Sequence, residues 1–119
     1  MDDIDEIIRE VLRPLGITRN YRGYPQVVCA VALAMEDETR LTEVTKRLYP
    51  VAAERTGSKP ENVERNLRTA VLRAWRVNRP LLDQMAKYHL MAPPCVSGFI
   101  DIVATYIQRD LLGPASAKL

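Results

Sequence analysis

The sequence has 119 residues, 47% of them hydrophobic and 27% charged, which suits one globular domain and excludes a disordered chain. Its longest apolar run, residues 27–35, is far short of the roughly 20 residues that span a bilayer, and its acidic start lacks signal-peptide chemistry, so we expect a cytoplasmic protein. The net charge of +2 hides a polarity, because residues 1–12 carry five acids and one base whereas residues 59–79 carry six bases and two acids, which favours a locally basic surface.

Apolar residues recur at helical spacing along the chain, and no segment shows the sustained alternation of a strand. The first helix is predicted over about 4–15, with its acids at the N-terminal end. The second begins near Pro25 and contains the apolar run, so it should be the most buried. A third helix is expected around 41–48. A short fourth runs from Pro50 to about Thr56 and is closed by Gly57.

The fifth helix is the basic segment, and it ends near Arg79. Ser58 and Glu61 have capping-box spacing, whereas Pro60 prefers the first helical position and would make Lys59 the cap. A weaker helix is predicted over 80–87, and a last one follows the Pro93-Pro94 pair and ends at Gly113-Pro114. We therefore predict an all-α, compact bundle of about six to seven helices, in one domain over residues 1–112, with a flexible tail at 113–119.

Residues 49–77 have the spacing of a helix-turn-helix. Ala53 lies four positions before Gly57, and the apolar Val63 lies six positions after it. The alanine lets the two helices approach closely, and the glycine accepts a positive φ at the bend. Val63 would lock the second helix onto the first.

The second helix of this unit has a core face and an outward face. At about 100° per residue, the core face comprises Val63, Leu67, Ala70 and Ala74. In a helix-turn-helix the second helix enters the major groove of DNA with its N-terminus first. We therefore predict that the bases are contacted by Asn62, Glu64, Arg65, Arg68 and Thr69. We predict that the phosphates are contacted by Ser58, Lys59, Arg73 and Arg76.

Each predicted contact has a chemical reason. The arginine forks of Arg65 and Arg68 match guanine N7 and O6, Asn62 can read adenine, and Glu64 can accept from cytosine. The cations further along displace counterions from phosphates. The competing interpretation is a merely solvated helix in which Glu64 pairs with Arg68. Leu72 on the outward face counts against DNA unless it packs on another element or protomer.

Five short segments carry a family resemblance. They are RGY at 22–24, TKRLYP at 45–50, VER at 63–65, AW at 74–75 and FIDIVA at 99–104. Together they resemble the C-terminal DNA-binding domain of the master sporulation response regulator, stage zero sporulation protein A, of endospore-forming bacteria. The resemblance extends from Ile7 to Leu111. It implies an all-helical domain that binds double-stranded promoter DNA by a helix-turn-helix and docks there as a tandem homodimer.

The resemblance also implies residue roles. The family's base-reading glutamate and arginine match Glu64 and Arg65, and a further helix arginine matches Arg68. The sequence departs from the family at Asn62, where the family has a base-reading arginine, and at Thr69, where it has histidine. The segment 78–91 corresponds to a region implicated in contacting the RNA polymerase sigma factor, but it is shorter here. We also expect no receiver domain, since no pattern of alternating strands and helices precedes residue 5.

Motifs of catalysis are missing from the sequence. It contains no GxxxxGK[ST], GxGxxG or GxSxG motif, its two cysteines lack CxxC spacing, and His89 has no ligand partner at suitable spacing. We therefore expect no enzyme, no metal and no cofactor. Two hypotheses follow. One is a sequence-specific transcription regulator; the other is a protein-interaction module of the same fold that sequesters a related regulator or an RNA polymerase subunit.

Overall fold

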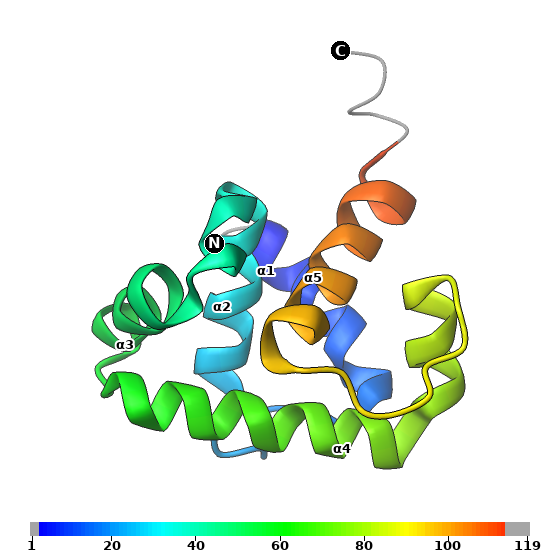
Figure 1. Ribbon diagram of the computed structural model, residues 1–119, viewed down its shortest axis with the longest axis horizontal. Coiled ribbons are helices and arrows are strands. Elements are labelled where there is room, and N and C mark those ends of the chain that lie inside the picture. Colours follow the sequence, from blue (N-terminus) through cyan, green and yellow to red (C-terminus); the bar gives the residue numbers. More distant parts are fainter. Residues whose placement is uncertain (1–2, 114–119) are drawn as a thin grey trace.

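The computed structural model describes residues 3–113, and all its regular elements are helical within that range. The all-α prediction is thus confirmed. α2 lies between α3 and α5, while α4 runs across one end of all three (Figure 1). The five α-helices are α1 (Asp3–Leu12), α2 (Tyr24–Glu36), α3 (Tyr49–Thr56), α4 (Pro60–Ala86) and α5 (Val96–Tyr106); short 3-10 turns η1 (Arg13–Leu15) and η2 (Glu38–Thr42) and π turns η3 (Val44–Leu48) and η4 (Ile107–Leu111) connect or extend them.

The predicted number of six to seven helices is wrong for this part of the chain. The segment 80–87 is the distal part of α4, which bends at Asn78, a residue with φ −152° and ψ 65°. Pro80 has no N–H to continue the helical ladder, and the Asn78 side chain accepts a hydrogen bond from the Leu81 N–H at 3.2 Å. Residues 41–48 form 3-10 and π turns in place of a third α-helix. The predicted tail at 113–119 lies almost wholly outside the described residues.

Both ends of the turn between α3 and α4 follow local chemistry. Gly57 adopts φ 66°, a left-handed conformation that glycine accepts without a Cβ clash. The Ser58 N–H donates to the Ala53 carbonyl at 2.8 Å, and the Gly57 N–H donates to the Glu54 carbonyl, which is the pattern of a Schellman ending. Pro60 occupies the first turn of α4, and Lys59 is the cap, without a side-chain hydrogen bond. Of the two predicted start signals, the proline therefore decides the boundary.

The core is apolar and is contributed by every α-helix. No polar or charged residue among those described is fully buried, and Leu12, Leu33, Leu67 and Phe99 have no exposed surface. α2 contributes most of its length to this core, as its apolar run predicts, and contacts the other four α-helices. None of the described helices combines the length and apolar character needed to cross a membrane.

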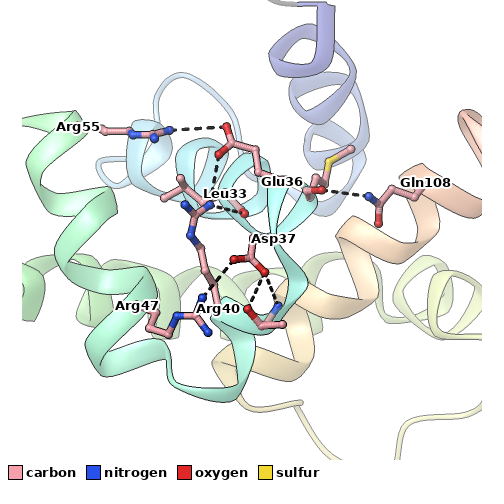
Figure 2. A network of polar contacts seen from close by, with 9 residues as sticks. Leu33, Glu36, Asp37, Arg40, Arg47, Arg55 and Gln108 are labelled. Atoms are coloured by element: carbon pink, nitrogen blue, oxygen red, sulfur yellow. Dashed lines mark hydrogen bonds and ion pairs between the residues drawn. The ribbon is translucent and has the colours of Figure 1, made fainter.

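Two acids at the C-terminal end of α2 hold the segment that leads into α3 (Figure 2). Glu36 contacts Arg40 at 3.3 Å and Arg55 of α3 at 3.8 Å. Asp37 accepts hydrogen bonds from the Thr39 backbone and hydroxyl and pairs with Arg47 at 3.2 Å. Because these groups are solvated, each pair contributes little free energy by itself. Together they hold η3 and α3 against the end of α2.

The register of α4 can be tested by a matched pair of substitutions. Leu67 is fully buried whereas Leu72 is 47% exposed. We expect Leu67→Ala to lower the free energy of unfolding by about 2–5 kcal/mol, since it leaves a cavity. Leu72→Ala should change it by no more than about 0.5 kcal/mol. Urea unfolding followed by circular dichroism measures both, and equal losses for the two variants would contradict this register.

A second test concerns Asp37 and acid. The hydrogen bonds from Thr39, followed by the charge of Arg47, lower the pKa of the Asp37 carboxyl. A carboxyl whose folded pKa is depressed stabilises the fold above its unfolded pKa of about 3.9, and this contribution is lost as pH falls through the folded pKa. Asp37→Asn keeps an acceptor for Thr39 but removes the charge. We expect the variant to be less stable than wild type at pH 6 and to lose less stability on going to pH 3. Urea midpoints at both pH values test this; a midpoint difference that is the same at both would refute it.

Candidate nucleic-acid interface

α3 and α4 form the predicted helix-turn-helix. Ala53 is 2% exposed and Val63 is fully buried, so the small residue and the apolar residue lie in the contact between the two helices. The turn at Gly57 has the positive φ that its position requires. The spacing inferred from the sequence therefore corresponds to a packed unit, in which α4 is the second helix.

α4 separates its apolar and basic residues onto opposite faces. The four predicted core residues, Val63, Leu67, Ala70 and Ala74, are all fully buried. Arg65, Thr69 and Arg76, which the helical period places opposite them, are exposed. The predicted rotation of the helix is confirmed, and the basic side chains lie on the face away from the core.

The predicted base-contacting residues lie together on the first three turns of α4 and pair with one another. The Arg65 guanidinium donates to the Asn62 side-chain oxygen at 2.6 Å, and the Arg68 guanidinium donates to the Glu64 carboxylate at 2.7 Å. The Thr69 hydroxyl donates to the Arg65 carbonyl at 3.0 Å. Each arginine uses one of its five N–H donors in these contacts, which leaves the others free for a ligand.

The predicted phosphate-contacting residues are less uniform. Lys59 and Arg76 are exposed, and neither has a carboxylate within 4 Å among residues 3–113. Ser58 is partly buried, and its N–H is used in the turn. Arg73 is exposed, yet its Nε donates to the Gly16 carbonyl. Arg73 thus has a structural contact that its position in the sequence did not reveal.

The connection that precedes α2 supports α4. No pattern in the sequence predicted this contact. The Tyr21 hydroxyl donates to the Asn66 carbonyl at 2.7 Å, and burial raises the pKa of Tyr21. A Cβ on Gly23 would lie 2.4 Å from the Asn66 Cβ, so only glycine permits this approach. The RGY segment at 22–24 carried the family resemblance, but its partner lies more than 40 residues away and no local pattern identifies it.

The sixth base of the basic segment, Arg79, has a structural role. Its guanidinium stacks 4.2 Å from the centre of the Trp75 ring and donates to the Leu90 carbonyl at 2.7 Å. It also lies 3.2 Å from His89, whose other ring nitrogen is 2.9 Å from the Asp83 carboxylate. His89 is exposed. These contacts tie the segment after α4 back onto the helix.

No cluster of three or more histidine, cysteine or acidic side chains suited to a metal occurs within the described range. The features that stand out are a packed helix-turn-helix and a second helix with exposed arginines on its outward face.

Comparison with protein-family models agrees with these features. The family described as "Sporulation initiation factor Spo0A C terminal" matches residues 8–107, which is most of the chain. The chain belongs to that family and is a DNA-binding effector domain of sporulation initiation, a regulatory class of domain and not an enzyme family.

Proposed function

We propose that the protein is a sequence-specific transcription regulator whose α4 enters the major groove with its N-terminal turns. The observation that carries this proposal is the position of Arg65 and Arg68. Both are exposed in the first three turns of α4, behind a helix-turn-helix bend, on the face turned away from the core. In a helix-turn-helix, side chains at this place reach base edges.

The pairs on α4 support base reading because they orient the donors. Asn62 holds one edge of the Arg65 guanidinium, and Glu64 holds one edge of Arg68. A guanidinium held in this way keeps its remaining N–H groups in a fixed plane, which suits the two acceptors of guanine. Asn62 and Glu64 can in turn contact adenine and cytosine, and Thr69 lies one turn after Arg65 on the same face.

Phosphate contacts would come from both ends of the outward face. Lys59 lies at the start of α4, which no side chain caps and where the positive end of the helix dipole favours an anion. Arg76 lies about three turns beyond Arg65, where a straight helix leaves the bases. Arg73 and the Ser58 hydroxyl are the remaining candidates. These contacts would add affinity without sequence discrimination.

A second candidate function is a protein-interaction module. It is favoured by the exposure of Met91 and Tyr88, which are 85% and 57% exposed in the segment after α4. In the family that the sequence resembles, this region is implicated in contacting the polymerase sigma factor. If the protein bound only such a partner, a related regulator or another polymerase subunit, it would not retain DNA at low salt.

The base-reading and phosphate roles can be separated by two arginine substitutions. Arg65→Ala should cost about 1–3 kcal/mol of binding free energy on a selected site and relax discrimination at one base pair. Arg76→Ala should weaken binding to all sequences alike and lower the salt slope by about one. Affinities for a selected duplex and a one-base variant, each at several salt concentrations, measure both effects.

Two results would contradict the proposal in different ways. Equal losses on both duplexes for both variants would reduce α4 to a basic patch without sequence reading. Failure of the wild-type protein to bind any duplex of a promoter pool at low salt would remove DNA binding altogether and leave the protein-interaction module.

We also propose that the domain is a monomer in dilute solution and pairs as a tandem homodimer on DNA. Leu72 is 47% exposed on the outward side of α4 and can pack on a second protomer. α5 offers less, since Phe99, Ile100, Val103 and Ala104 are already buried within the domain. We expect sedimentation at micromolar concentration to give a monomer and a two-site duplex to bind two copies. A dimer that persists at nanomolar concentration without DNA would contradict this.

A further inference from the structure

The connection between η1 and α2, residues 16–23, lies against the side of α4. Figure 1 shows this blue segment crossing behind α4 and emerging at the lower edge of the view. It contains two successive turns, in which the Tyr21 N–H donates to the Thr18 carbonyl at 2.8 Å and the Tyr24 N–H donates to the Tyr21 carbonyl at 3.0 Å. The connection therefore has a defined backbone conformation.

Contacts at three positions along α4 hold this segment and the residues just before it against the helix. Tyr21 and Gly23 meet Asn66, the Gly16 carbonyl accepts from Arg73, and the Pro14 carbonyl accepts from the Asn78 side chain at 3.0 Å. From residue 66 to residue 78 the helix rises about 18 Å. Residues 14–23 together are thus braced along more than three turns of α4, and the connection itself along about two, so its backbone keeps a set position relative to the helix.

The braced side of α4 borders its outward face. Asn66 follows Arg65 by one residue, about 100° around the helix, and Arg73 lies within about 20° of Asn66. Thr69, a predicted base-contacting residue, lies near the Tyr21 hydroxyl and lowers its pKa, against the larger effect of burial. The connection therefore begins where the predicted base-reading face ends.

The width of the major groove determines which part of the DNA a segment packed beside α4 would contact. The major groove is about 12 Å wide, and an α-helix with its side chains is about 10–12 Å across. A segment packed against the side of a helix in the groove finds no room beside it and must lie over the bordering phosphates. A cation on that segment would contact DNA without reading its sequence.

Arg22 meets these requirements. It is exposed and adjoins Gly23, where an added Cβ would clash with Asn66 of α4. It has no carboxylate within 4 Å in the part of the chain described. Arg13, by contrast, pairs with Glu10 at 3.1 Å. Arg19 is also exposed, but it lines a surface hollow whose other charged residues, Glu6, Arg9, Glu10 and Arg13, belong to α1 and η1. No residue of α4 lines that hollow.

We propose that the connection at 16–23 is a second DNA-contacting element, in which Arg22 binds a backbone phosphate beside the groove that α4 enters. The inference rests on the proposed function, because it requires α4 to dock in the major groove. It adds a contact that lies outside the helix-turn-helix, and it assigns the connection a role in affinity and not in sequence choice.

The test compares two arginines that differ in pairing and place. Arg22→Ala and Arg13→Ala each remove one exposed guanidinium group. The first removes it from the connection and the second from η1. Binding of each full-length variant to a selected duplex and to a one-base variant is measured over a range of salt concentrations, with Arg65→Ala as a reference. Arg22→Lys is included because it keeps the charge and removes the planar fork.

We expect Arg22→Ala to weaken binding to both duplexes by the same factor and to lower the salt slope by about one. Arg22→Lys should retain most of the slope, and Arg13→Ala should match wild type. Thermal unfolding of Arg22→Ala should coincide with that of wild type, because the side chain makes no hydrogen bond or ion pair with residues 3–113. If it does not, Arg22→Lys and Arg22→Gln are compared in its place.

The failures are distinguishable. If wild type binds DNA and Arg65→Ala loses discrimination, but Arg22→Ala behaves like Arg13→Ala, this inference is wrong and the proposed function stands. A loss confined to one duplex would also overturn it, since it would mean base reading by Arg22. If wild type binds no duplex at low salt, the proposed function fails and the inference fails with it.

Discussion

The buried stripe of α4 is the constraint on which the rest of the structure depends. Val63, Leu67, Ala70 and Ala74 lose all their exposed surface against the other helices. Burial of apolar area is the main favourable contribution to folding, so it determines the rotation of α4 about its axis. The small alanines allow close approach to the neighbouring helices. With this rotation of α4 about its axis, its arginines lie on the outward face or at the borders of that face.

The arginines of this domain fall into groups that the total charge does not distinguish. Arg40, Arg47 and Arg55 pair with the two acids that end α2 and hold the first helix of the helix-turn-helix (Figure 2). Arg79 stacks on Trp75 and ties down the segment after α4. Others within residues 3–113, such as Arg22, Arg65 and Arg76, remain exposed and without a carboxylate partner. These are available to a polyanion, together with the donors of Arg68 that Glu64 leaves free. Counting basic residues in the segment 59–79 thus overstates the surface that can bind DNA.

The α3–α4 unit depends on parts of the chain far from it. Its turn is local, because a glycine and the backbone bonds of Ser58 and Gly57 close α3. Its support comes from the end of α2 on one side and from residues 14–23 on the other. A helix-turn-helix is too small to bury a core by itself, so its geometry is stable only within the whole domain. One of these supporting residues, Gly23, adjoins the exposed Arg22.

The sequence by itself determined the helical class, the turn at Gly57 and the two faces of α4, because these follow from spacing between residues close in the chain. It predicted the start of α4 only ambiguously, and the structure decides for Pro60. It predicted too many helices, since residues 41–48 form only short turns and the segment after Pro80 is the distal part of α4, beyond the non-helical bend at Asn78. Only the tertiary structure decided which arginines are already engaged and that Tyr21 and Gly23 pack on Asn66. Several of those contacts join residues 10 to 57 positions apart, and side-chain pairing over such separations leaves no periodic signal in a single sequence.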